Sequence, residues 1–562
     1  MDLVTSPAER SDSIDSSDSF VPAPDIRTAR RGFAFRAGIL ALLALIPVYV
    51  ICLTAPGFGM FHDDGIYTVT AKALAEGKGY SIISLPNAPP QTKYPPLLPF
   101  LLSIVWRIAP QFPANIVALR LIPFVAATAW LALLFVYARR LVGETAAIWI
   151  CVLIAANRWV IFTSSIVMSE SLFALLSLAS VWLLEKLRRS DSLLRAGALA
   201  AVAVLAYLTR TAGVAIFGTG VVALLLARRR RSAVILVLSA VVSAGVWSVW
   251  QRQSVRAATS IENYYTAQNY RDSAITSPRF DFADKAQIAA ATAIYVFTSP
   301  ARLFCVPITT GLGIPGSVFL LLWLNGLFWL VAARGFSSLP ISARLLTILY
   351  AGMILCWVWH PDRLLLPILP FLLIACCRGS KGWPAMRFVI PAVIACTVLG
   401  ALGSAAYSSR HGIAQPGGVF SLFLEEEPVS ALDSAAPLDY AKMSELYDWI
   451  RRNTAKEAVI LAGYDPALYL YTGRRAIRPF VADGMPMFYW DDKSYFNRTS
   501  EFNSLIATYR PAYLLEMAND VQTEPHYFHL LRDLKRQGRI QLVKEFSPHY
   551  RIFRFTAPIP PQ

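Results

Sequence analysis

The chain has 562 residues, of which 56% are hydrophobic and only 16% charged, and its mean hydropathy is +0.48. Soluble domains carry about 25% charged residues, so this composition excludes an ordinary soluble protein and predicts a polytopic membrane protein. The net charge of +16 does not indicate nucleic-acid binding, because the basic residues form short clusters between apolar runs, as in the cytoplasmic loops of membrane proteins.

The first 32 residues are rich in serine and aspartate and are too polar to bury a core, so we expect a disordered cytoplasmic tail. The apolar run near 37–56 starts too late and is too long for a signal peptide, and it reads as a retained first span. The seven cysteines all lie in apolar segments and show no metal or redox spacing.

Charge decides the predicted topology, because Lys and Arg collect in cytoplasmic loops. The basic clusters are Arg30-Arg31, Arg139-Arg140, Lys186 to Arg189 with Arg195, Arg228 to Arg231, Arg334 with Arg344, and Arg378 to Arg387. An even number of crossings between neighbouring clusters keeps all of them inside. The predicted spans lie near 37–56, 115–138, 144–162, 168–187, 195–208, 212–227, 232–250, 312–333, 342–359, 364–377 and 388–406.

The apolar segment Pro95 to Ile108 is not counted as a span. It is short, begins with prolines, and would place Arg139-Arg140 outside if it crossed. We expect a re-entrant or surface-lying helix there. About eleven transmembrane helices over residues 33–409 remain, with outer loops at 57–114 and 251–310.

Residues 410–562 have a different composition. An amphipathic helix end at 446–454 precedes an apolar stretch, Ala458 to Gly463, which reads as a buried strand. Later strands are predicted at 512–515, 540–543 and 551–555. Because helical segments alternate with these strands, we expect a small extracytoplasmic α/β domain.

The predicted topology gathers ionisable side chains on the outer side of the membrane. They are Asp63, Asp64, Lys93, Glu170, Arg210, His360, Asp362 and Arg363. Adjacent carboxylates beside hydrocarbon are costly unless they are used, so Asp63-Asp64 predicts a functional site. The chain has no phosphate-binding loop, GxGxxG or HExxH motif. An enzyme that works outside the membrane also lacks nucleotide substrates there, so the topology predicts an activated substrate that arrives dissolved in the bilayer on a lipid carrier.

These motifs, in this order, resemble those of the GT-C polytopic glycosyltransferases, in particular the bacterial branch related to protein O-mannosyltransferases and aminoarabinose transferases. The matching segments are Asp63-Asp64, Lys93-Tyr94-Pro95-Pro96, Ser169-Glu170, Leu208-Thr209-Arg210, and Asp362 to Pro367. The stretch Tyr469 to Arg474 is similar to uncharacterised bacterial members. The resemblance covers about 400 residues.

The resemblance implies an inverting transfer of a sugar from a polyprenyl-phosphate donor to a hydroxyl or amine of an acceptor glycan, lipid or protein. The enzyme would lie among the lipids of the bacterial inner membrane. Asp63 matches the proposed general base, with Asp64 beside it. Lys93, Arg210 and Arg363 are placed to bind the departing phosphate, and Tyr94, Glu170, His360 and Asp362 complete the expected substrate site.

The sequence departs from the family pattern at one position that bears on metal binding. In the aminoarabinose branch a glutamate precedes the lysine and helps to hold a metal, whereas Thr92 precedes Lys93 here. This argues against a metal site of that type. His62 and His360 with neighbouring carboxylates still leave a divalent cation open.

Several alternatives stay open from the sequence. Asp63-Asp64 fits a solvated helix cap, and Glu170 fits a complement to a helix N-terminus. Arg210 fits a side chain that snorkels to the headgroups, and His360 to Arg363 fits an interfacial turn. Aromatic residues at 485–491 fit either a sugar-stacking platform or a core, and Tyr264, Tyr265 and Tyr270 fit either a lid or an interfacial belt.

For the function of the whole chain, the alternatives are a transporter or lipid flippase without glycosyl transfer, and a polysaccharide polymerase or ligase.

Overall fold

The structure is a computed structural model that describes residues 26–59, 61–257, 281–304, 314–357, 361–410, 440–478, 499–517, 525–547 and 550–556. Several predicted features lie outside the described residues. They are most of the N-terminal tail, Tyr264, Tyr265, Tyr270, His360 and the aromatic stretch 485–491.

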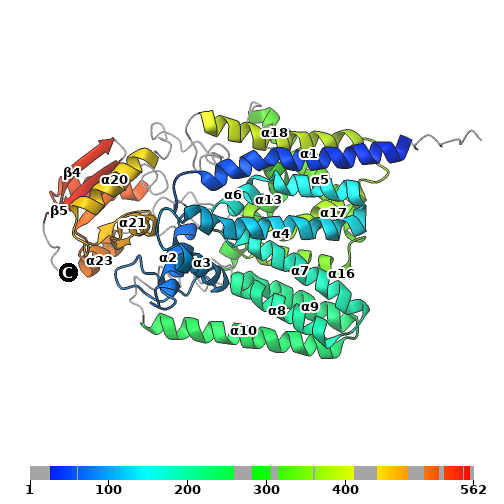
Figure 1. Cartoon of the computed structure of the whole chain (residues 1–562), viewed down its shortest axis with the longest axis horizontal. Helices are drawn as coiled ribbons and strands as arrows, with labels where there is room; N and C mark the ends of the chain where they lie inside the picture. Colours follow the sequence, from blue (N-terminus) through cyan, green and yellow to red (C-terminus); the bar gives the residue numbers. More distant parts are fainter. Residues whose placement is uncertain are drawn as a thin grey trace, which may run out of the picture.

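A bundle of helices forms one end of the molecule and a small sheet forms the other, as Figure 1 shows. The bundle helices are α1 (Ile26–Thr54), α4 (Ile116–Val142), α5 (Glu144–Ala155), α6 (Arg158–Ser165), α7 (Glu170–Arg189), α8 (Leu193–Thr209), α9 (Val214–Leu226), α10 (Arg230–Ala257), α13 (Phe282–Phe304), α15 (Ile314–Phe336), α16 (Ile341–Leu355), α17 (Leu369–Gly379) and α18 (Met386–Arg410). Each predicted span overlaps one of these helices, with α5 and α6 together covering the span near 144–162.

Four described helices are each long and apolar enough to cross a membrane, and the bent pair of α5 and α6 raises this number to five. They lie at Gly32–Thr54, Ile116–Val142, Arg230–Ser254 and Met386–Ala406. Exposed valines and leucines along α10, such as Val241 and Leu238, face outward from the bundle. These helices make the chain an integral membrane protein, while the total of eleven crossings stays a prediction.

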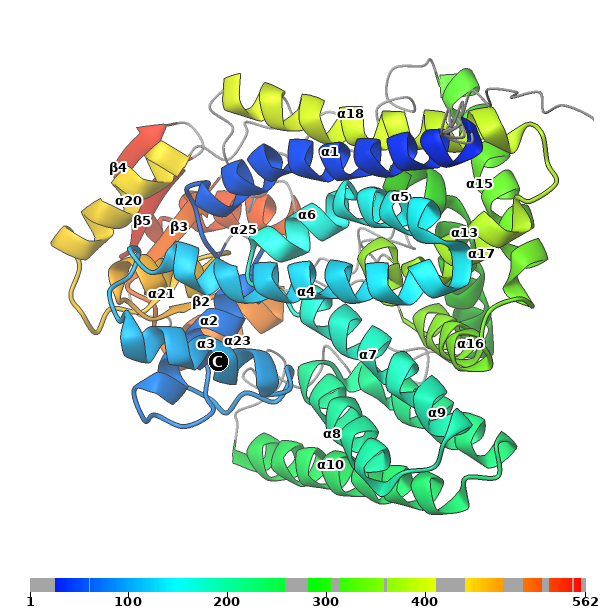
Figure 2. The same cartoon turned by 45° about the vertical axis from the view of Figure 1, so that its right-hand side comes forward.

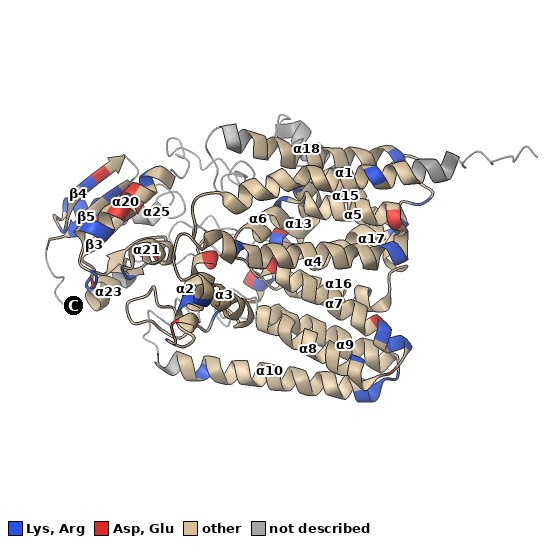
Figure 3. Cartoon of the chain, viewed as in Figure 1, with Lys and Arg blue, Asp and Glu red and all other residues tan. Residues whose placement is uncertain are grey.

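Basic residues gather at one end of the bundle. Figure 3 shows Lys and Arg at the ends of α7, α9 and α10 that lie farthest from the sheet. Because Lys and Arg collect on the cytoplasmic side of membrane proteins, this separation predicts that the basic end lies in the cytoplasm and the sheet outside. The sidedness itself stays a prediction.

The segment between the first two bundle helices forms a cap on the other end of the bundle. Helix α2 (Asp63–Ala75) packs on α3 (Leu97–Ile108), which also contacts α4 and α8. The short helix predicted from 95–108 is therefore confirmed. One side of α3 buries Leu98, Leu102 and Trp106, while Phe100, Ile104 and Ile108 are exposed.

Helix α13 was not expected, because the sequence prediction assigned residues 251–310 to one outer loop. Residues 282–304 instead form a helix that packs against α15, α16 and α18. Its apolar stretch, Ile288 to Phe297, is shorter than the roughly 20 residues of a span, so it gave no sign of a membrane helix in the sequence. It carries Ser299 and Arg302 into the interior of the bundle, where they contact Asp362.

The C-terminal sheet has the strand order β2-β1-β3-β5-β4. Its strands are β1 (Ile460–Leu461), β2 (Ala476–Ile477), β3 (Tyr513–Met517), β4 (Ile540–Ser547) and β5 (Tyr550–Phe555). β1 is parallel to both β2 and β3, and β5 is antiparallel to both β3 and β4. The helices around it are α20 (Tyr440–Asn453), α21 (Asp465–Thr472), α23 (Thr499–Tyr509) and α25 (Pro525–Arg536).

All four predicted strands are confirmed, and β2 was missed because two residues are too few to show a periodic pattern.

One core of this domain is shared with the outer loop. Val69, Ile82 and Leu85 pack with Leu514 and Phe553 in one buried cluster. The backbone N–H of Ala476 in β2 also donates to the carbonyl of Ser84 at 3.0 Å. The sheet is thus built onto the loop that precedes Lys93.

Candidate functional site

The adjacent carboxylates Asp63 and Asp64 begin α2, and their side chains have different surroundings. Asp64 accepts the N–H groups of Gly59 at 2.9 Å and Phe61 at 3.2 Å, and its side chain is buried. Burial raises the pKa of Asp64 to about 6, although the N–H groups of Gly59 and Gly65 and the charge of Arg120 favour the ionised form. Asp64 therefore shapes the loop before α2, while Asp63 lies among other charged groups.

Asp63 is surrounded by one hydroxyl and two cations. The Tyr94 hydroxyl donates to Asp63 Oδ1 at 2.5 Å, Lys93 Nζ lies 3.8 Å from the same oxygen, and an Arg363 nitrogen lies 3.7 Å from Oδ2. Burial alone would raise the pKa of Asp63, but Lys93, Arg363 and the Tyr94 hydroxyl outweigh it, so the pKa lies below its usual value. Asp63 is therefore ionised at neutral pH.

Glu170 and Arg210 extend this group of charges. Arg210 donates to Glu170 Oε1 at 2.7 Å and to Ser169 Oγ at 3.1 Å, while Arg363 lies 3.6 Å from the same Glu170 oxygen. We call Asp63, Lys93, Tyr94, Glu170, Arg210 and Arg363 the open cluster. It brings together six of the predicted site residues from five separate segments, at the end of the bundle next to the sheet.

The open cluster is accessible to solvent. The side chains of Asp63, Lys93, Arg210 and Arg363 are 17–22% exposed, whereas Glu170 beneath them is 3% exposed. The Asp63 and Glu170 carboxylates are bridged by Arg363, so negative and positive groups alternate. This arrangement presents cations to an incoming anion while it keeps one carboxylate at the same surface.

Hydrogen bonds fix the backbone that carries Lys93 and Tyr94. The Gln91 side-chain oxygen accepts the N–H groups of Lys93 at 2.8 Å and Tyr94 at 3.3 Å. From α10, Trp250 donates to the carbonyl of Gln91 and Gln251 to that of Thr92, both at 2.9 Å. The end of α10 therefore positions the lysine.

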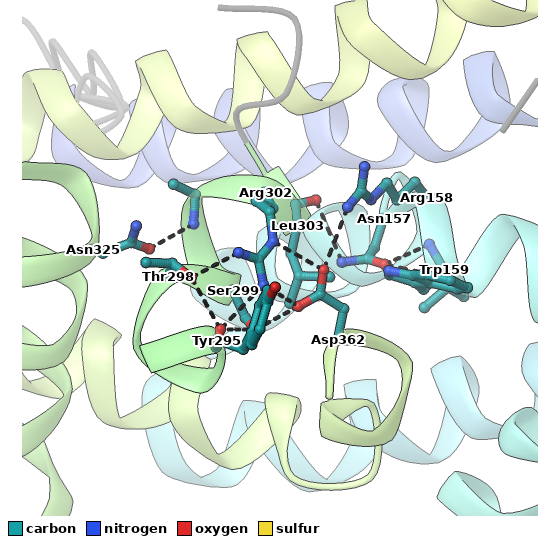
Figure 4. Close-up of polar contacts among 12 residues, drawn as sticks. Asn157, Arg158, Trp159, Tyr295, Thr298, Ser299, Arg302, Leu303, Asn325 and Asp362 are labelled. Carbon is teal, nitrogen blue, oxygen red and sulfur yellow. Dashed lines mark hydrogen bonds and ion pairs between the residues drawn. The ribbon is translucent and has the colours of Figure 1, made fainter. Parts of the chain in front are cut away.

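Asp362 does not join the open cluster, although it was predicted as a site residue. It is 1% exposed, and Figure 4 shows it among Ser299, Arg302 and Arg158. Arg302 donates to both carboxylate oxygens at 2.8 and 3.1 Å, Ser299 to one at 2.5 Å, and Arg158 to the other at 3.4 Å. We call these four residues the buried cluster. We assign Asp362 a structural role, because its oxygens are already bound by these donors.

Sequence reasoning missed three arginines inside the bundle, of which Arg120 and Arg158 are buried and Arg302 nearly so. Arg158 and Arg302 belong to the buried cluster, and Arg120 of α4 donates to the carbonyls of Leu53, Ala55 and Gly57 at the end of α1. The sequence could have singled out Arg120 and Arg158, because both lie inside predicted spans and an ionisable residue inside a membrane span needs a polar partner. Arg302 lay in a predicted loop and gave no such signal.

The carboxylates of the open cluster do not fit a divalent cation. Asp63 and Glu170 are bridged by Arg363, and Lys93 and Arg210 lie beside them. A metal ion there would meet these positive groups. His62 binds Asp465 through Nε2 at 3.0 Å. Among the described residues, no three His, Cys, Asp or Glu side chains are grouped as metal ligands.

No protein-family model and no curated protein matches the sequence. Solved structures do match the fold. ArnT of Cupriavidus metallidurans, an aminoarabinose transferase, aligns over 94% of this chain and 99% of its own, with a TM-score of 0.52 and 13% identity, in the structure bound to undecaprenyl phosphate. Its apo structure aligns with a TM-score of 0.51, over 94% of this chain and 98% of its own, at 13% identity.

The chain shares the fold of ArnT, which is a GT-C glycosyltransferase. The archaeal oligosaccharyltransferase of Archaeoglobus fulgidus also aligns, over 85% of this chain and 67% of its own, with 12% identity and a TM-score of 0.46. The likeness to ArnT confirms the predicted helical, GT-C-like fold, and the predicted C-terminal sheet is present, while the number of spans stays a prediction. The GT-C likeness does not identify the site residues, which rest on the geometry above.

Proposed function

We propose that the chain is an inverting glycosyltransferase that moves a sugar from a polyprenyl-phosphate donor to an acceptor on the outer face of the membrane. The open cluster carries this proposal, since the ionised Asp63 carboxylate lies beside Lys93 and Arg363, and Glu170 joins Arg363 to Arg210. A base and a set of phosphate-binding cations are the two parts that this reaction needs.

The chemistry assigns one role to each part of the open cluster. The acceptor hydroxyl or amine attacks the anomeric carbon while Asp63 takes its proton. The bond between that carbon and the phosphate oxygen breaks, and its electron pair goes to the phosphate. Lys93, Arg210 and Arg363 stabilise the growing negative charge. A single displacement of this kind inverts the anomeric configuration, and Asp63 returns its proton to water.

The low pKa of Asp63 suits a base that acts late in the displacement. The carboxylate is ionised at neutral pH, and the Tyr94 hydroxyl bound to Oδ1 fixes its orientation. The acceptor becomes acidic only as its bond to the sugar forms, so a weak base in the correct position is sufficient. Glu170 holds Arg210 and Arg363 together, because two unpaired arginines would repel each other.

Two observations support a donor that is dissolved in the bilayer. The open cluster includes Glu170 at the start of α7 and Arg210 directly after α8, so it lies at the ends of bundle helices, where we place the lipid headgroups. The solved ArnT structure, which shares the fold, is bound to undecaprenyl phosphate. We place the enzyme in the bacterial inner membrane, with residues 1–32 in the cytoplasm, 33–409 as the membrane domain and 410–562 outside. The acceptor class stays a glycan, a lipid or a protein.

Transfer assays with the purified protein test this function. Polyprenyl-phosphate sugars and total membrane acceptors are incubated with wild type, Asp63→Asn and the matched control Asp448→Asn, which changes an exposed carboxylate of α20. We expect Asp63→Asn to lose about 1,000-fold in kcat, as for a general base, with the melting temperature and donor binding retained. Unchanged transfer in Asp63→Asn would remove the base, and no transfer with any carrier would favour a transporter.

A further inference from the structure

The first turn of α21, in the C-terminal domain, packs against the backbone on both sides of Asp63. Figures 1 and 2 both show α21 beside the start of α2. A Cβ on Gly59 would lie 2.8 Å from Ala467 Cβ, and a Cβ on Gly65 would lie 2.7 Å from Pro466 Cβ. Glycine at these two positions lets α21 approach this closely.

His62, the residue before Asp63, has a strained backbone. Its φ is 66° and its ψ is −53°, and the Asp63 N–H donates to the Phe61 carbonyl at 2.8 Å. These features define a γ-turn of the rare positive-φ kind. A non-glycine residue keeps such a conformation only where its surroundings hold it, and such residues cluster at functional sites.

One hydrogen bond from α21 holds the side chain of this strained residue. His62 Nε2 lies 3.0 Å from Asp465 Oδ1, and the Asp465 side chain is fully buried at the start of α21. A carboxylate only accepts, so the His62 Nε2–H donates. The turn ends at Asp63, and its geometry sets the direction in which the Asp63 side chain leaves the backbone.

We propose that Asp465 is a positioning residue, which holds the His62 turn and so aims Asp63 at the acceptor. This inference rests on the proposed function, because it needs Asp63 to be the base. It gives the C-terminal domain a part in the chemical step. The donor cations Lys93, Arg210 and Arg363 stand on other segments, so donor binding does not depend on Asp465.

The expected signature is therefore a loss of kcat without a rise in KM for the donor. Asp465→Ala removes the acceptor, and we expect kcat to fall roughly 10- to 100-fold, as for a misplaced catalytic group. Asp465→Asn keeps an oxygen that accepts the His62 N–H, so it should rescue most of the rate. A residue with only a structural role would lower the amount of folded protein, not the rate of each folded molecule.

A double-substitution cycle tests whether Asp465 acts through His62. His62→Ala should lose kcat to the same extent as Asp465→Ala, and the double variant should lose no more than either one. Asp448→Asn, on the exposed face of α20, is the matched control in the same domain. If Asp465→Ala fails to fold, the kcat of His62→Ala decides the question.

Wild-type kcat in both Asp465→Ala and His62→Ala, with Asp63→Asn inactive, would overturn the positioning role and leave the proposed function standing. The positioning role would also be overturned if the kcat loss of the double variant equalled the product of the two single losses. His62 and Asp465 would then act independently of each other. Full activity of Asp63→Asn would instead remove the base itself, which is a failure of the proposed function.

Discussion

The open and buried clusters use the same residue types for opposite purposes. In the buried cluster the side chains of Asp362, Arg302 and Arg158 are 2–11% exposed, and Arg302 binds Asp362 at 2.8 Å. In the open cluster Asp63, Lys93 and Arg363 are 17–21% exposed, and their ion pairs measure 3.7–3.8 Å. The close pairs of the buried cluster saturate Asp362, whereas the loose pairs of Asp63 leave Lys93 and Arg363 able to bind a ligand. Arg210 binds Glu170 closely, at 2.7 Å, but its side chain is 22% exposed.

Asp362 and Arg363 make the comparison sharper because they are neighbours in the sequence. Both lie in the short helix η3 (Asp362–Leu365), yet one enters the buried cluster and the other the open cluster. Asp63 and Asp64 divide in a similar way between a partly exposed and a buried position. Ionisable residues near a membrane surface therefore mark a functional site only when their partners and exposure are known.

The largest expected effect is on stability, from Asp362→Ala. Removing this carboxylate leaves Arg158 and Arg302 as buried charges without their counter-ion, which costs about 3 to 5 kcal/mol in the free energy of unfolding. Denaturant titration of purified protein measures this, with Asp448→Asn as the exposed control. A variant as stable as wild type would show that Asp362 is not a structural counter-ion.

The next largest effect is on activity, from Arg363→Ala. Loss of a phosphate-binding cation should lower kcat/KM by about 100-fold, while stability changes little because Arg363 is partly exposed. Arg363 lowers the pKa of Asp63, so its removal should raise that pKa and move the acid limb of the pH–rate profile to higher pH. If the acid limb of the pH–rate profile does not move, the charge of Arg363 does not lower the pKa of Asp63.

Asp64 predicts a pH dependence of stability. Burial raises its pKa to about 6 in the folded protein, so the folded state binds this proton more tightly than the unfolded chain does. The stabilisation from the bound proton, about 3 kcal/mol, is complete below about pH 4 and is lost as the pH rises through 6. The difference in stability between wild type and Asp64→Asn should change over this window. If the difference in the free energy of unfolding between the two proteins were constant from pH 4 to pH 7, the pKa of Asp64 would not be raised by burial.

The smallest effect is expected from Glu170→Gln. The amide keeps an acceptor for Arg210 but removes the charge that holds Arg210 and Arg363 together. We expect kcat/KM to fall about 10-fold, with KM for the donor affected most. Steady-state kinetics measure the split between the two parameters. A loss in kcat alone would point to contact between Glu170 and the reacting sugar.

The order of helices and strands was predictable because each element carries its own pattern. Long apolar runs predicted α1, α4, α10 and α18, and short apolar stretches predicted β1 and β3. Helix α13 was not predictable in this way, because its apolar stretch is short and its packing against α15, α16 and α18 stabilises it. The same holds for β2, which forms only beside β1.

The sequence by itself determined the membrane class, the order of the elements and most of the ionisable residues that form the open cluster. Only the tertiary structure decided that Asp63 and Arg363 face this cluster while Asp64 and Asp362 are buried. Consecutive residues of a helix leave its axis about 100° apart, so neighbours enter different surroundings. Packing from distant segments, such as α13 on Asp362 and α21 on His62, decides what those surroundings are.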